Sequence, residues 1–134
     1  MNLFTAIKVS ATALEAQKVR MNVSASNIAN ANSTRTAEGS GPYRRKDVQF
    51  AAHLMDEGVY GVDVRAIVED ERPFPRVYDP GHPDADSEGL VTRPNVNVIE
   101  EMVNMMTATR AYEANVTAIN NARAMVQKAL ELGQ

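Results

Sequence analysis

The residues best able to bind a cation lie in one loop near the middle of the chain. Asp84, Asp86, Glu88 and Gly89 follow one another as at the start of a calcium-binding loop. Such a loop requires a bidentate Glu at its twelfth position, and that position, counted from Asp84, is Asn95. We therefore favour a turn capped by its own Asp side chains over a calcium site.

The histidines offer a second kind of chemistry. His82 lies beside Asp84 and Asp86 and could bind a transition metal with them. A protein zinc site uses at least three ligands, and the other histidine, His53, is far away in the sequence. Neither histidine has a serine at a spacing that predicts a nucleophile and its base. The residues therefore predict no cofactor, no metal and no enzyme.

The elements that must position this loop are helices at the two ends of the chain. Residues 97–132 contain no proline and no glycine, and their apolar residues recur with a spacing of seven. This pattern predicts one helix of roughly 50 Å with an apolar seam along it. The predicted seam residues are Val98, Met102, Met105, Tyr112, Val116, Ile119, Val126 and Leu130.

A matching helix is predicted at the start of the chain, over residues 3–31. Ile7, Leu14, Met21 and Ile28 are seven residues apart, and Lys18 interrupts the pattern beside them. We expect the two helices to pair as an antiparallel coiled coil. Because the seams are long, we also expect other chains to complete their burial, so the seam residues are predicted assembly contacts.

The middle of the chain predicts a small amount of β-structure. Residues 61–69 alternate apolar and polar side chains, as a half-buried strand does, and Val48 and Phe50 form a shorter alternating piece. Two prolines make residues 72–76 an extended connector rather than a central strand. The fold class is therefore mainly α, with a β-hairpin or irregular middle in which a sheet of two or three strands is the most we expect.

Polar residues mark the ends of the predicted helices. Asn27 and Asn30 belong to a polar helix terminus, and a sharper hypothesis is that they hydrogen-bond to a neighbouring chain. Asn97 is a predicted N-cap with Glu100 closing a capping box, and Gly133 stands where a C-terminal cap belongs. These ends divide the chain into residues 1–36, 37–93 and 94–134.

Composition narrows the classes of partner. The net charge is −3, and the basic run at residues 44–46 is short and has no further basic residues beside it, so we expect no nucleic acid. We predict that this run pairs with acids of a neighbouring chain. The sequence has no cysteine, which excludes disulfides. No apolar run reaches the length of a membrane span or a secretory signal, so we expect no lipid insertion and no cleaved signal peptide.

Three segments together resemble a known family. The motif at residues 26–30 is similar to the signature of bacterial flagellar rod and hook proteins, and residues 95–106 and 110–115 resemble their C-terminal segment. With the loop at residues 78–86, the resemblance narrows to the C-type subunits of the proximal rod. The motif residues are Ser26, Asn27, Ala29, Asn30, Tyr78, Pro80, His82, Pro83, Asn95 and Val96.

The resemblance implies a structural role and a set of partners. It implies a rod subunit that transmits torque, packed against other proximal and distal rod subunits and against the adaptor between rod and membrane ring. It also implies export by the flagellar type III apparatus and assembly in the periplasmic space.

A helical adaptor that binds a target helix in a groove is the alternative function. An adaptor would stay monomeric at high concentration, whereas a rod subunit would associate.

Overall fold

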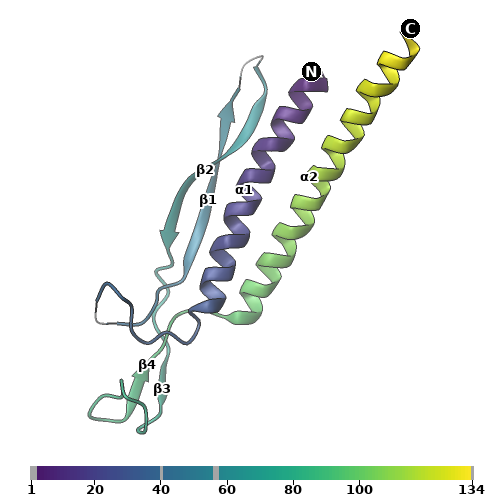
Figure 1. The fold of residues 1–134 in the computed structure, drawn as a ribbon. Coiled ribbons are helices and arrows are strands. Elements are labelled where there is room, and N and C mark those ends of the chain that lie inside the picture. The colour runs from purple at the N-terminus through teal and green to yellow at the C-terminus, as the bar shows by residue number, and fades with distance from the viewer. Residues whose placement is uncertain (1–2, 40, 56–57, 134) are drawn as a thin grey trace.

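The structure of the chain is a computed structural model that describes residues 3–39, 41–55 and 58–133. Along the described chain, four strands lie between two long helices, and both helices were predicted from the sequence (Figure 1). The elements in chain order are α1 (Leu3–Ala29), β1 (Lys46–Leu54), β2 (Tyr60–Glu69), β3 (Arg76–Tyr78), β4 (Leu90–Thr92) and α2 (Val98–Leu132).

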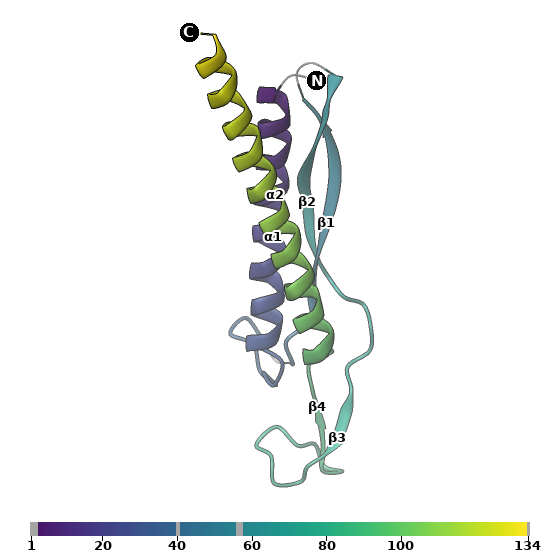
Figure 2. The same cartoon turned by 90° about the vertical axis from the view of Figure 1, so that its right-hand side faces the viewer.

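Helix α1 is the middle layer of an elongated molecule. The β1–β2 hairpin lies along one side of α1 and α2 lies along the other, so that α1 packs against all three elements (Figures 1 and 2). The start of α1 and the end of α2 lie at the same end of the molecule. The small β3–β4 sheet extends beyond the opposite end of the helices.

The two helices run in opposite directions, side by side. Near one end the Asn27 Nδ2 donates to Glu101 Oε2 at 3.0 Å, and further along the Thr109 hydroxyl donates to Met21 Sδ at 3.4 Å. The more buried side chains of α2 recur at alternating spacings of three and four residues. They are Glu101, Met105, Ala108, Tyr112, Asn115, Ile119, Ala122 and Val126.

This packed face differs in part from the predicted seam. Ala108 and Ala122 are buried within it, because their small side chains let the helices approach closely. Val98, Met102 and Leu130, which the sequence pattern placed on the seam, are exposed. The sequence also shows a row of small residues beside the predicted seam that would let another helix approach closely, and the burial of Ala108 and Ala122 agrees with it.

The helix ends follow local capping rules. The Asn97 side chain accepts from the N–H groups of Ile99 and Glu100, which confirms it as the N-cap. The Glu100 carboxylate accepts from Arg72 Nη1 at 3.3 Å, and the described hydrogen bonds include none from the Asn97 N–H to Glu100, so the predicted capping box is not closed. At the other end the Gly133 N–H donates to the Leu130 carbonyl, as predicted for a C-terminal cap.

The strands form two antiparallel pairs in the described part of the chain. Strand β1 pairs with β2 from Lys46 opposite Glu69 to Leu54 opposite Tyr60, with a bulge between Gln49 and Phe50. Strand β3 pairs with β4. The alternation predicted for residues 61–69 is confirmed, whereas β1 is longer than the short piece predicted around residues 48–50.

The hairpin approaches α1 closely at Gly61. The Val62 N–H donates to the Thr12 hydroxyl at 3.1 Å, and that hydroxyl donates to the Val9 carbonyl at 2.8 Å. A Cβ on Gly61 would come within 2.9 Å of Thr12 Oγ1 and 2.8 Å of Met55 Sδ. Glycine is therefore required for this contact between strand and helix.

Candidate functional site

A cluster of buried polar side chains ties together the end of α1, the hairpin and the start of α2. We call it the polar junction, and its members are Asn27, Tyr43, Arg45, Asp70, Asn95 and Glu101. Buried polar groups of this kind stabilise a fold only when their hydrogen bonds are made.

Asn27 is the centre of the polar junction and is fully buried. Its Nδ2 donates to the Lys46 carbonyl at 2.8 Å and to Glu101 Oε2 at 3.0 Å. Its Oδ1 accepts from the Lys46 N–H and from the Tyr43 hydroxyl, both at 3.0 Å. An Asn amide has two donors and two acceptor sites, so this side chain is saturated within its own chain. The hypothesis that Asn27 bonds to a neighbouring chain is therefore wrong.

Asn30, the second Asn of the motif, serves the end of α1. Its Nδ2 donates to the Ser26 carbonyl at 2.9 Å, and its Oδ1 accepts from the Ser33 hydroxyl at 3.1 Å. Both contacts are local, as expected for a polar helix terminus.

Arg45 links the base of the hairpin to the start of α2 through charge. Its Nε donates to Glu101 Oε1 at 2.5 Å, and its Nη1 lies 3.3 Å from Asp70 Oδ2. Burial alone would lower the pKa of Arg45, but its hydrogen bond and charge interaction with Glu101 outweigh burial and raise it. The prediction that this basic run pairs with another chain is therefore wrong for Arg45, because its partners belong to its own chain and its side chain is buried.

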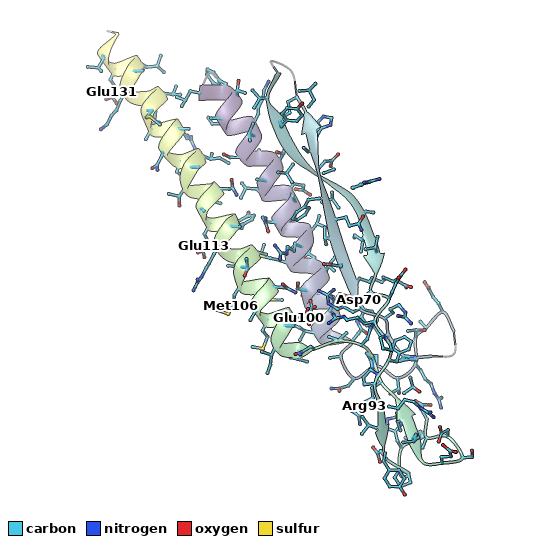
Figure 3. The ribbon with its side chains drawn as sticks, turned by 180° about the vertical axis from the view of Figure 1, so that it is seen from behind. Asp70, Arg93, Glu100, Met106, Glu113 and Glu131 are labelled. Carbon is cyan, nitrogen blue, oxygen red and sulfur yellow. The ribbon has the colours of Figure 1, made fainter. Side chains whose placement is uncertain are left out.

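Asn95 and Asp70 hold the connector between the hairpin and α2. Asn95 Oδ1 accepts from the Arg45 N–H at 2.8 Å, while its Nδ2 donates to the Asp70 and Arg72 carbonyls. Hydrogen bonds from the Arg72 side chain and backbone lower the pKa of Asp70 to about 2. Arg72 also reaches Glu100, which lies near Asp70 in Figure 3.

The carboxylates of the acidic loop pair with arginine side chains and accept hydrogen bonds from the loop's own backbone. Asp84 accepts from the Thr34 hydroxyl at 2.7 Å and pairs with Arg35. Asp86 accepts from the N–H groups of Glu88 and Leu90 and also pairs with an arginine, Arg76. Within the described ranges, no three His, Asp or Glu side chains gather as a metal site would require. The geometry is that of the turn favoured from the sequence.

Tyr78 and Pro80 of the loop motif lie against Gly89. Gly89 has a φ of +75°, and a Cβ there would lie 3.0 Å from Tyr78 Cε2 and 3.1 Å from Pro80 Cβ. His82 Nδ1 accepts from the Asp84 N–H at 3.0 Å, so this histidine stabilises the turn. Pro83 is exposed.

The other predicted residues divide between packed and exposed positions. Ile7, Leu14, Met21 and Ile28 on α1, Val116 on α2, and Val96 are half-buried. Ser26 and Ala29 are exposed.

An exposed apolar surface of α2 lies near its start. We call it the methionine patch, and it consists of Ile99, Met102, Val103 and Met106, which are between 53% and 74% exposed. Figure 3 shows Met106 on the side of α2 away from α1. A hollow of about 340 Å³ is lined here by Met102, Met105, Met106, Thr109 and Arg110. Such a surface is suited to packing against another helix.

Sequence reasoning missed the polar junction, although one signal pointed to it. Glu101 lies four residues before Met105, on the same face of α2. A charged residue in line with a seam requires a buried partner, because an unpaired charge is costly to bury. Arg45 and Asn27 are these partners.

No helix in the described part of the chain is both long enough and apolar enough to span a membrane.

Comparison with known proteins identifies the family. Residues 7–35 match the family described as "Flagella basal body rod protein", and residues 87–132 match "Flagellar basal body rod FlgEFG protein C-terminal". The chain is 45% identical to the flagellar basal-body rod protein FlgC of Bacillus subtilis (strain 168), over all of both chains. It is 43% identical to FlgC of Borreliella burgdorferi (strain B31), over 100% of this chain and 99% of the relative. It is also 43% identical to FlgC of Salmonella typhimurium (strain LT2), over all of both chains. The chain therefore belongs to the FlgC family of flagellar basal-body rod proteins, which are structural proteins and not enzymes.

Proposed function

We propose that this rod protein builds the proximal rod by helix packing, with α1 and α2 paired as an antiparallel coiled coil. In this proposal residues 1–36 and 94–134 form the axial core, and residues 37–93 form the loop and β-strand region that packs on it. The observation that carries the proposal is the methionine patch, because a contiguous apolar surface on a helix is a site for another protein.

In this proposal each copy would contact its neighbours through unlike surfaces. A contact between unlike surfaces that does not close into a ring generates a helical array. The polar junction fixes α1, the hairpin and α2 at one end, so each copy would present these surfaces in the same relative position. This rigidity suits a shaft that transmits torque. The neighbours proposed are proximal and distal rod subunits and the adaptor between rod and membrane ring.

The route to the rod is also part of the proposal. Export by the flagellar type III apparatus, without a cleaved signal peptide, would deliver the chain to the periplasmic space where the rod is assembled. The resemblance of the three sequence motifs to rod subunits supports this route.

The proposal is tested by placing charge on the methionine patch. Met102→Asp with Met106→Asp changes two exposed side chains, so the chain should fold and be exported but fail to enter the basal body. Asn120→Asp adds the same kind of charge at an exposed polar position further along α2 and is the matched control. The measurements are circular dichroism of the purified chain, immunoblots of isolated basal bodies, and swimming in soft agar. Normal incorporation of the double variant would contradict the proposal.

A further inference from the structure

The thioether sulfurs of methionine are the most easily oxidised groups in this chain. The sequence contains neither cysteine nor tryptophan, so no thiol or indole competes with them for an oxidant. A peroxide therefore reacts first with methionine, and it reacts faster with an exposed side chain than with a buried one. Burial then decides which methionines are oxidised.

Three methionines of α2 are exposed to solvent. Met102 is 53% exposed, Met125 is 56% exposed and Met106 is 58% exposed. Met102 and Met106 are four residues apart, so they are neighbours on one face of the helix, and Figure 3 shows Met106 on the side away from α1. Both line the hollow of about 340 Å³ in the methionine patch, which is large enough to admit a small oxidant.

The three other described methionines are shielded. Met21, Met55 and Met105 are half-buried. The Met21 sulfur also accepts a hydrogen bond from the Thr109 hydroxyl at 3.4 Å. This bond engages a sulfur lone pair, and a lone pair is what attacks a peroxide. Met21 should therefore react slowly, and it serves as an internal reference.

We propose that Met102 and Met106 form an oxidation site, which hydrogen peroxide converts to methionine sulfoxide in the unassembled chain, and that this conversion prevents assembly. The inference rests on the proposed function, in which another protein covers the methionine patch. In the reaction the sulfur attacks one oxygen of the peroxide and the O–O bond breaks. The sulfur keeps that oxygen, whose proton passes to the departing hydroxide to give water. The sulfur loses two electrons and the peroxide gains them.

The sulfoxide changes what the methionine patch can pack against. It replaces a flexible apolar group by a polar one with a strong hydrogen-bond acceptor. Burying such an acceptor in an apolar contact is costly, and the adjacent side chains of Ile99 and Val103 carry no donor. Since Met102 and Met106 are exposed, their oxidation should leave the packing within the chain unchanged.

Peroxide treatment of the purified full chain tests the site. The chain is exposed to hydrogen peroxide for increasing times, and peptide fragmentation in a mass spectrometer assigns each added oxygen, about 16 Da, to its residue. Met102 and Met106 should be oxidised at least about three-fold faster than Met21, while the helical circular dichroism signal stays constant. Equal rates at Met102, Met106 and Met21 would overturn the site.

Leucine variants test the consequence in cells. Met102→Leu with Met106→Leu keeps apolar side chains of similar volume but removes both sulfurs. Met125→Leu is the matched control, because it removes an equally exposed sulfur of α2 outside the methionine patch. Cells producing each chain receive a brief pulse of peroxide, and immunoblots of isolated basal bodies measure incorporation. Incorporation with peroxide is divided by incorporation without it, so that a change in the basal level cancels.

The ratio should fall at least about five-fold for the unchanged chain and for Met125→Leu, and much less for the double leucine variant. Equal ratios for the double variant and the unchanged chain overturn the inference, and so does protection by Met125→Leu. The unchanged chain gives a second readout. Sulfoxide at Met102 and Met106 should be at least about five-fold rarer in isolated basal bodies than in the unassembled pool, and equal fractions would overturn the inference.

These outcomes can be told apart from those that test the proposed function. The effect of Met102→Asp with Met106→Asp needs no oxidant. If that variant stays out of basal bodies while peroxide leaves incorporation of the unchanged chain unaltered, the methionine patch is an assembly surface and only the oxidation inference is wrong.

Discussion

Replacing Asn27 by Ala should destabilise the isolated chain strongly. The substitution removes four hydrogen bonds: one to Glu101, one from Tyr43 and two with the Lys46 backbone. The bonds to Glu101 and Tyr43 are buried, so their remaining partners have little access to water. Each buried polar group left without a partner costs about 1–3 kcal/mol, which gives an expected loss of about 2–6 kcal/mol. This is a large share of the about 5–15 kcal/mol that stabilises a typical domain.

The assay is urea unfolding of the purified chain, followed by circular dichroism at a helical wavelength. Asn30→Ala is the matched control because Asn30 belongs to the same motif, but its bonds to Ser26 and Ser33 lie close to solvent. We expect this control to lose about 1 kcal/mol or less. Equal losses for the two variants would refute the reasoning that Asn27 acts within its own chain, and so would an unchanged midpoint for Asn27→Ala.

Two further predictions concern acid and packing. In the folded chain the pKa of Asp70 is lowered from 3.8 to about 2, chiefly by hydrogen bonds from Arg72, so its charge stabilises the fold above about pH 4 and this contribution is lost as the pH falls towards 2. A series of urea midpoints between pH 7 and pH 2 should therefore decline less steeply below pH 4 in Asp70→Asn, and identical profiles would contradict this. Gly61→Ala should lower the free energy of unfolding by about 1–3 kcal/mol, because its Cβ would overlap Thr12 and Met55. Gly39→Ala, whose Cβ would meet no atom within 4 Å, is the control and should change this free energy by at most about 0.5 kcal/mol. Thermal melts of both variants measure the difference.

The helices were predictable because their signals are local. The spacing of apolar residues fixes a helix from any short window, and the caps at Asn97 and Gly133 depend on neighbours a few residues away. The strand at residues 61–69 was recognisable for the same reason, since alternation is also a short-range pattern. The turn at residues 79–89 followed from its own Asp and Gly residues.

The polar junction was not predictable in the same way. Its contacts join residues 16 to 74 positions apart, such as Asn27 with Tyr43 and with Glu101, and no local pattern determines which distant acid meets Arg45. The packed face of α2 shows a related effect. Ala108 and Ala122 are buried because the helices come close together, whereas the larger Met102 and Leu130 lie outside this narrow contact. Side-chain size at a close helix contact depends on the partner as well as on the sequence of one helix.

The central position of α1 makes the chain mechanically unequal at its two ends. Helix α2 packs against α1, and the hairpin packs against the other side of α1, so a force that extracts α1 first removes the support of every other long element. A force applied at the carboxyl-terminal end of α2 acts first on residues 127–133, which are all exposed. It then separates α2 from α1 while the hairpin stays packed on α1. Pulling from the amino-terminal side would thus dismantle the whole tertiary structure in one event, whereas pulling from the carboxyl-terminal side would proceed in stages.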